Sequence, residues 1–204
     1  MNLPLQSGDY GSALAAAVAR AETGIVIYLV KEGARVNEPL QSGRHGSALA
    51  VALALSAART ASYRSTEIVE FLVEEGADVN MPLQIGGYGS ALAVAVANRN
   101  ADIARFLIRK GADVNMQLQS GKCGSALAAA AYLGRTAWAE ALIEAGAKVN
   151  LRLENGAFST ALQASQADGS QEDQIDRSWN VGFSKQGKAE VAELLHRYGA
   201  TDEV

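Results

Sequence analysis

The hydrophobic positions of this chain follow two helical patterns that alternate along its length. A short alanine-rich run such as "ALAVAVANRN" places Leu92, Ala95 and Val96 at the i, i+3, i+4 spacing of one helix face. A second run, "ADIARFLIRKGADVN", places Ile103 and Phe106 on an apolar face and its charged side chains on the opposite face. The pattern predicts pairs of short helices, and the small alanine side chains of the first helix let neighbouring pairs approach closely.

The residues at the ends of these runs predict where the helices begin and end. Ser90 precedes the first run, where its hydroxyl can accept a free backbone N–H as an N-cap. Gly111 follows the second run, and glycine adopts the left-handed conformation that ends a helix at little cost.

The helix pairs belong to an internal repeat. The phrase "LQSGDYGSAL" returns as "LQSGRHGSAL", "LQIGGYGSAL", "LQSGKCGSAL" and, more divergent, "LENGAFSTAL". The glycine after the second run recurs at steps of 43, 35, 35 and 53 residues, at Gly33, Gly76, Gly111, Gly146 and Gly199. The unit therefore has 35 residues, with an insertion of 8 in the second unit and of 18 in the fifth. Because one unit cannot bury its apolar face alone, the units are expected to stack into a solenoid.

A helix–turn–helix unit that ends in "GADVN" and is followed by a long turn resembles the ankyrin repeat, whose usual period is about 33 residues. "GGYGSAL" together with "GADVN" is similar to fungal-type ankyrin arrays. The resemblance covers nearly the whole chain. It implies one all-α domain, residues 1–204, an ankyrin-repeat solenoid of about five helix–turn–helix units with extended turns. The expected units span roughly 1–37, 38–80, 81–115, 116–150 and 151–204.

The chain departs from the family pattern in two respects. The family's T-P-L-H is replaced by Ser90-Ala91-Leu92-Ala93, which keeps the capping hydroxyl and lacks the proline and the histidine. In addition, Met1-Asn2 aligns with Val79-Asn80, and no separate polar capping helix precedes Ser12. We expect either a fragment of a longer protein or an array whose turn arm serves as its cap.

Composition narrows the classes of function. The net charge of −4 argues against general nucleic-acid binding, and no stretch has the roughly 18 apolar residues of a membrane span. The start of the chain has no signal-peptide pattern, and the single cysteine excludes an internal disulfide framework. These features predict an intracellular, cytoplasmic protein with no nucleic-acid or membrane partner.

The repeated phrase changes at the same two positions in every unit. The changing pairs are Asp9-Tyr10, Arg44-His45, Gly87-Tyr88, Lys122-Cys123 and Ala157-Phe158. The resemblance implies that these turns project as fingers and line a concave groove with the first helices, whose ends add Arg20, Leu55, Asn98, Tyr132 and Leu133. Aromatic residues with arginine and lysine are typical of binding hot spots. The predicted binding residues are therefore Tyr10, Arg44, His45, Tyr88, Asn98, Lys122, Cys123, Tyr132 and Phe158. The alternative is that the aromatic rings pack against their own turns.

The two insertions lead to separate expectations. The first, about residues 56–63, is expected to extend the first helix or to loop out beyond it. The second, about residues 169–186, carries Trp179 and Phe183, which need a surface to cover. They form either a flap that faces a ligand or a cap over the last unit.

Signals for catalysis or metal binding are weak. "GKCGS" has Met116 in place of the first glycine of a phosphate loop and Cys123 in place of its serine or threonine. His45 and Cys123 occupy equivalent turns two units apart, about 20 Å, which is too far for one zinc ion. His196 is interpreted as a surface or helix-terminus residue. Cys123 is either a small turn residue or a thiol activated by Lys122. We therefore predict no catalytic residue, no metal site and no cofactor.

Two functions remain. The first is a non-enzymatic recognition module that binds a protein or peptide through its groove and fingers, an inference from fold-level analogy. The alternative is a small-molecule-binding protein or an unusual enzyme, with a pocket between the groove and residues 169–186. Asp168, Tyr88, Tyr132 or Trp179 would act there. A passive spacer within a larger protein is a third possibility.

Overall fold

A computed structural model describes residues 10–40, 45–56, 62–84, 88–98, 100–167 and 184–201, without the side chains of 62–64. Ten helices and no strand lie in these ranges. They are α1 (Ala13–Ala19), α2 (Thr23–Lys31), α3 (Ala48–Leu55), α4 (Ser62–Glu74), α5 (Ala91–Ala97), α6 (Ala101–Arg109), α7 (Ala126–Leu133), α8 (Thr136–Glu144), α9 (Ala161–Gln166) and α10 (Lys185–Arg197). The predicted all-α solenoid of paired helices is confirmed.

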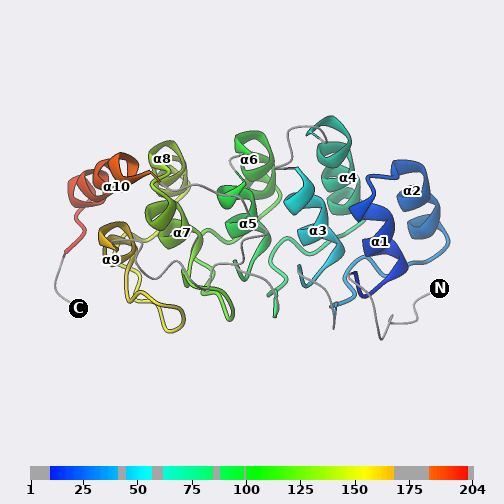
Figure 1. Cartoon of the computed structure of the whole chain (residues 1–204), viewed down its shortest axis with the longest axis horizontal. Helices are drawn as coiled ribbons and strands as arrows, with labels where there is room; N and C mark the ends of the chain where they lie inside the picture. The colour runs from blue at the N-terminus through cyan, green and yellow to red at the C-terminus, as the bar shows by residue number, and fades with distance from the viewer. Residues whose placement is uncertain are drawn as a thin grey trace.

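The helices form two parallel rows (Figure 1). The odd-numbered helices, here called the inner row, lie next to the loops that project downward in Figure 1; the even-numbered helices form the outer row. Each inner helix packs on the next, from α1 through α3, α5 and α7 to α9. The core runs along this row, where every residue of α5 and α7 is buried, and the inward faces of the outer helices complete it. A helix that is apolar on all sides can only be stable when it is covered in this way.

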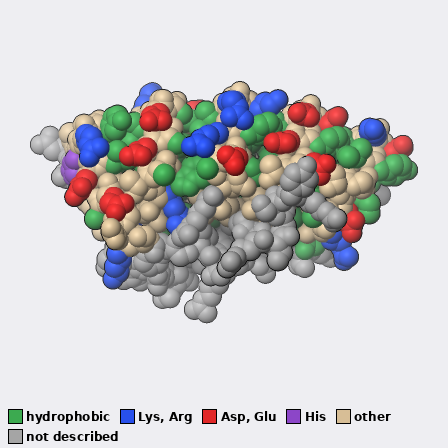
Figure 2. Space-filling view, turned by 90° about the horizontal axis from the view of Figure 1, so that it is seen from above, with side chains coloured by type: hydrophobic (Ala, Val, Ile, Leu, Met, Phe, Trp, Pro, Cys, Tyr) green, Lys and Arg blue, Asp and Glu red, His purple; other side chains and the backbone are tan. Residues whose placement is uncertain are grey.

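The outer row carries the charged surface. Acidic, basic and apolar side chains are interspersed along it when the solenoid is seen from above (Figure 2). Helix α6 is the clearest case, because Ile103, Ala104 and Leu107 are buried while Asp102 and Arg105 are exposed. Its predicted amphipathic face is therefore confirmed.

Each inner helix begins at a hydroxyl side chain, as the sequence predicts for Ser90. The hydroxyl oxygen accepts a hydrogen bond from the backbone N–H three residues later, at 3.1–3.2 Å. The five capping residues are Ser12, Ser47, Ser90, Ser125 and Thr160. This bond satisfies one of the backbone donors that a helix start leaves without an intrahelical acceptor.

Glycines have two different roles in the repeat. Gly111, after α6, has φ +90°, and no atom lies within 4 Å of where a Cβ would stand, so backbone conformation alone favours glycine there. Gly124, before α7, has φ +70°, and a Cβ would stand 2.4 Å from the carbonyl oxygen of Asn155 in the next unit. At Gly124 the close approach of two units also excludes a side chain.

The two insertions lengthen outer helices. Helices α4 and α10 have 13 residues, whereas α2, α6 and α8 have 9. Helix α3 ends at Leu55, and α4 already begins at Ser62. The first insertion therefore does not extend the first helix, and its end forms the added first turn of α4. In the same way, the end of the second insertion forms the start of α10. The alternative expectation for the first insertion, a loop beyond the first helix, falls on residues 57–61, which lie outside the described residues.

A row of asparagines joins the units in the segments that lead from the outer helices into the projecting loops. The Asn80 amide donates to the Gly111 carbonyl at 2.9 Å, and its oxygen accepts from the Asp113 backbone N–H at 2.7 Å. Equivalent pairs of bonds are made at 2.7–3.1 Å by the other members, Asn37, Asn115 and Asn150. We call these four residues the asparagine ladder. Each one belongs to one unit and completes the outer loop of the next.

Candidate functional site

The loops that precede the inner helices are here called finger loops: residues 81–89, 116–124 and 151–159 in the last three units. They are bonded to one another. The Gln117 side chain donates to the Arg152 carbonyl at 3.1 Å and accepts from the Glu154 backbone N–H at 3.0 Å. The Ala157 N–H donates to the Lys122 carbonyl at 2.8 Å. The Ser120 hydroxyl donates to the Leu83 carbonyl. The three fingers therefore form one continuous edge.

The predicted binding residues differ in burial. Tyr10 is 37% exposed, and His45, Asn98, Lys122 and Phe158 are half-buried. The last group is buried: Tyr88, Cys123 and Tyr132, with exposed fractions of 4%, 2% and 1%. Arg44, Asp168, Trp179 and Phe183 lie outside the described residues. The row of changing residues is thus part surface and part interior.

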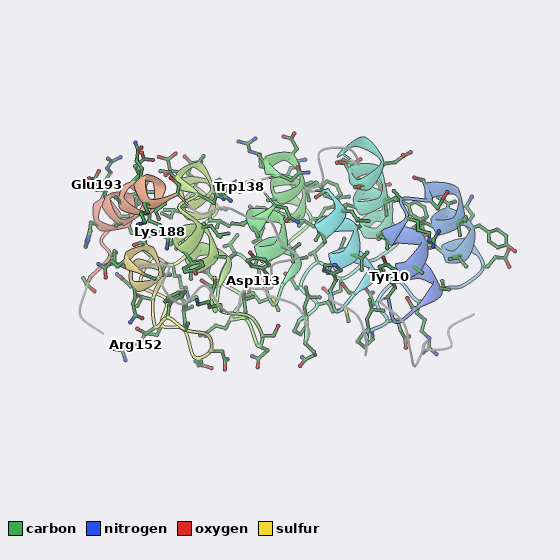
Figure 3. The ribbon with its side chains drawn as sticks, viewed as in Figure 1. Tyr10, Asp113, Trp138, Arg152, Lys188 and Glu193 are labelled. Carbon is green, nitrogen blue, oxygen red and sulfur yellow. The ribbon has the colours of Figure 1, made fainter. Side chains whose placement is uncertain are left out.

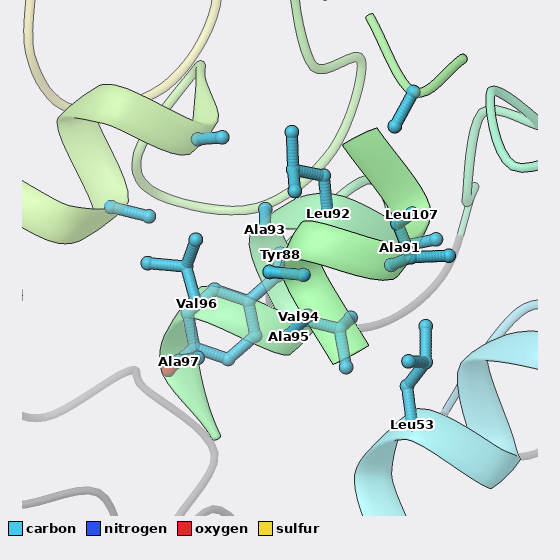
Figure 4. Packing of buried hydrophobic residues seen from close by; sticks show 14 of the residues in the cluster. Leu53, Tyr88, Ala91, Leu92, Ala93, Val94, Ala95, Val96, Ala97 and Leu107 are labelled. Atoms are coloured by element: carbon cyan, nitrogen blue, oxygen red, sulfur yellow. The ribbon is translucent and has the colours of Figure 1, made fainter. Parts of the chain in front are cut away.

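Asn98 and Tyr88 show what the less exposed positions contact. The Asn98 amide donates to the Leu53 carbonyl at 2.8 Å, which links the end of α5 to α3. Tyr88 belongs to the hydrophobic cluster around α5 (Figure 4). Among the described side chains of the finger loops, the exposed ones are Pro82, Gln84, Gln119, Arg152, Glu154, Asn155 and Ala157.

Several of the predicted residues meet around the ring of Tyr132, at the end of α7. Phe158, from the next finger, packs on this ring with the centroids 5.3 Å apart. The Lys122 ammonium lies 5.0 Å from the ring centroid and 3.5 Å from the phenol oxygen. The Lys188 ammonium lies 4.4 Å from the same centroid. One tyrosine ring thus lies within cation–π distance of two lysines.

Sequence reasoning missed two members of this cluster, Arg135 and Lys188. They stand eleven residues before the glycine that follows the outer helix, the position held in the other units by Glu22, Ser65 and Asn100. Arg135 is 8% exposed and Lys188 is 5% exposed. Lys188 points between α10, α7 and α9, where it donates to the Ala167 carbonyl at 2.8 Å, whereas Glu193 on the same helix is directed outward (Figure 3). Aligning the units on this glycine would have placed the two cations in neighbouring layers.

Burial decides the protonation of the two acidic groups beside the cluster. Desolvation raises the pKa of the Cys123 thiol to about 12, although Lys122 and Lys188 act in the opposite direction. Desolvation also raises the pKa of the Tyr88 phenol, Cys123 and Tyr132 add to this, and Arg135 opposes it. Both groups are therefore neutral at pH 7. The hypothesis of a thiol activated by Lys122 is wrong, and Cys123 is a small buried turn residue.

The described residues contain no group of three or more His, Cys, Asp or Glu side chains placed to hold a metal ion. His196 is exposed in the last turn of α10, where its Nδ1 lies 3.3 Å from the Ala200 carbonyl oxygen. None of the helices within the described ranges combines the length and the apolar character needed to cross a bilayer.

Comparison with known families agrees with this architecture. Residues 55–153 match the family of ankyrin repeats, in three copies. The matched range runs from the end of α3 to the start of the fifth finger and includes most of the asparagine ladder. No curated protein was found to be similar to the chain. Residues 55–153 therefore carry ankyrin repeats, and the fold of the chain is an all-helical ankyrin solenoid.

Proposed function

We propose that the chain is a non-enzymatic recognition module that binds a protein or peptide along its finger edge. Ankyrin repeats are in general protein–protein interaction modules, and this likeness gives the class of function. The fungal-type likeness of the motifs and a cytoplasmic location remain predictions from the sequence.

The single observation that carries the proposal is the bonding between neighbouring fingers. Gln117 makes two hydrogen bonds to the next finger, and the Lys122 carbonyl accepts a third. A surface held in this way loses little conformational freedom when it binds, so more of the contact energy is available as affinity. The bonds between fingers use backbone groups and the side chains of Gln117 and Ser120, and the exposed residues of the loops are left for contact.

The burial of α5 and α7 limits where a partner can dock. All side chains of these two inner helices are buried, so they offer a partner no exposed residue. The proposed contact surface is therefore the exposed residues of the finger loops, with Tyr10 and Lys122. Tyr88, Cys123 and Tyr132 would act from beneath that surface.

A selection of peptides from a random display library tests this function. The bait is the full chain, and the finger variant changes Tyr10, Gln119, Lys122 and Asn155 to alanine. A matched outer-row variant changes four exposed residues to alanine, namely Tyr28, Arg105, Lys110 and Glu140.

We expect peptides that bind the native chain and the outer-row variant equally, with at least about tenfold weaker binding to the finger variant. Failure to select any peptide, or equal binding to all three proteins, would contradict the proposal. Circular dichroism and thermal melting of each variant establish that the substitutions leave the fold intact.

A further inference from the structure

The fifth finger, the loop before α9 in Figure 1, differs from the other fingers at one position. Every finger has a glycine three residues after its leucine, and Asn155 precedes this glycine in the fifth. The residues at the same place in the other units are Ser7, Ser42, Ile85 and Ser120. Asn155-Gly156 is therefore the only Asn-Gly pair in the sequence.

The surroundings of the Asn155 side chain also differ from those of its counterparts. It is exposed, and within the described part of the chain its amide has no hydrogen-bond partner. The Ser120 hydroxyl, at the same place in the fourth finger, is half-buried and donates to the Leu83 carbonyl. The ladder residue Asn150 is exposed as well, but its amide makes two bonds to the loop after α10, at 2.8 and 3.1 Å. The Asn155 amide is thus free to turn toward its own backbone.

The backbone after this asparagine leaves the next nitrogen accessible. Gly156 has no side chain that would crowd its nitrogen, and it lies in neither a helix nor a strand. Its N–H makes no hydrogen bond among the described residues, although the loop is held on both sides. The Glu154 N–H donates to Gln117 at 3.0 Å, and the Ala157 N–H donates to the Lys122 carbonyl at 2.8 Å. A backbone nucleophile and an unbonded amide carbon are therefore adjacent at an exposed place.

We propose that Asn155 is a site of spontaneous deamidation in the folded protein. The Gly156 nitrogen loses its proton to hydroxide and attacks Cγ of Asn155, an intramolecular step that closes a five-membered ring. The bond from Cγ to the side-chain nitrogen breaks, this nitrogen takes a proton from water, and ammonia leaves. Water then opens the succinimide ring at either of its two carbonyl carbons. The products are aspartate, with the main chain unchanged, and isoaspartate, whose main chain runs through the former side chain.

Both products change the fifth finger. Each adds one negative charge beside Glu154, in a chain whose net charge is already −4. Isoaspartate also lengthens the main chain by one carbon atom between Glu154 and Ala157, the two residues that bond to the fourth finger. A longer backbone between these anchors would weaken one or both bonds. The proposal is independent of the recognition of proteins by the fingers, because the reaction needs only water.

Incubation of the full chain at neutral and at mildly alkaline pH, followed by digestion and tandem mass spectrometry, tests the proposal. Deamidation raises the mass of the modified peptide by about 1 Da. Isomerisation of Asp168, which also precedes a glycine, leaves the mass unchanged and is distinguished in this way. We expect Asn155 to react at least about tenfold faster than Asn150, whose amide is held and which precedes a leucine. The rate should rise with pH, because only the deprotonated nitrogen attacks.

Two variants isolate the reaction and its effect. Asn155→Ser introduces the residue that three other units have at this place, so it should fold and melt as the native chain does and show no such product. Asn155→Asp reproduces the aspartate product and should keep the native melting temperature within about 2 °C. The isoaspartate form, separated by chromatography, should melt below both, since its main chain is longer between the two anchored residues.

Three results would overturn the proposal. In the first, Asn155 of the folded chain reacts no faster than Asn150, whether or not the chain unfolded in urea reacts at Asn155. In the second, a different asparagine is modified first in the folded chain. In the third, the isoaspartate form melts together with Asn155→Asp, which would refute the stated effect on the bonds between fingers.

Discussion

Two neighbouring regions of this solenoid join the same units in different ways. The asparagine ladder, whose members directly precede the finger loops, repeats one pair of bonds from each unit to the next, at nearly constant distances. Within the finger loops the bonds between units vary: Gln117, Ser120 and the Lys122 carbonyl each take part in a different contact. The repeated bonds of the ladder keep the units in register, and this leaves the finger loops free to vary in sequence.

The largest expected effect comes from adding a methyl group at Gly124, where two finger loops are in close contact. Gly124→Ala should lower the free energy of unfolding by about 4 kcal/mol, because the new methyl group would overlap the Asn155 carbonyl and φ is positive. Gly146→Ala, with φ +93° and no atom near the new Cβ, should lower it by only about 1 kcal/mol. Urea unfolding of both variants measures the difference, and equal losses would show that the close approach of the fingers is unimportant.

Removing the ring of Tyr132, at a position where the other four units have alanine, should have the next largest effect. Tyr132→Ala should lower the free energy of unfolding by about 3 kcal/mol, since Phe158 and two lysine stems lose their packing partner. Tyr132→Phe, which keeps the ring, is the control and should lose less than about 1 kcal/mol. If Tyr132→Ala left the free energy of unfolding unchanged, the ring would contribute no more to stability than the alanine at the same position in the other units.

One member of the asparagine ladder can be removed without touching the fingers. Asn115→Ala should lower the free energy of unfolding by about 2 kcal/mol, because the Gly146 carbonyl and the Lys148 N–H each lose a partner. Gln117→Ala, which removes two bonds between fingers, should lower it by a similar amount, because its partners on Arg152 and Glu154 are as exposed to water as those of Asn115. A clearly larger loss for Gln117→Ala would mean that the bonds between fingers, and not the ladder, keep the units in register.

The smallest expected effect is a dependence on pH. The Cys123 thiol titrates at about 12 when folded, against an ordinary value of 9.0, so the unfolded chain releases this proton first as the pH rises. Stability from the neutral thiol is complete below pH 9 and is lost progressively between pH 9 and about 12. Under reducing conditions, unfolding from pH 8 to 10 should show a decline of about 1 kcal/mol that is absent in Cys123→Ala. Parallel profiles would contradict the burial of an ionisable thiol.

Features that depend on neighbours within a few residues could be predicted from the sequence. The Ser90 hydroxyl caps its helix by accepting from the backbone N–H three residues later, and Gly111 has the left-handed backbone that ends the helix before it. Both roles depend only on neighbours in the sequence, so the sequence was sufficient to predict them. The Val-Asn pair at the end of the second run in the first four units was visible too, but the hydrogen bonds that its asparagine makes were not. Asn80 bonds to residues 31 and 33 positions away, which only the stacking of units brings near.

The candidate site was predicted only in part, for a similar reason. Lys122, Tyr132 and Phe158 were identified because they vary between units or end the first helices. Lys188 was not, because it is neither a changing finger residue nor the end of a first helix; only counting back from Gly199 places it at the position that Arg135 holds in the unit before. Burial of Tyr88 and Cys123 also escaped sequence reasoning, since a position that varies between repeats is not thereby exposed.

The asparagine ladder also has a consequence for a chain that is synthesised from its N-terminus. Each asparagine precedes in the chain the loop that it completes, so a newly synthesised unit emerges with one amide whose partners have not yet been made. Water solvates that amide until the following unit is translated and docks. Every later unit therefore meets an amide acceptor and donor that are already present on the unit before it.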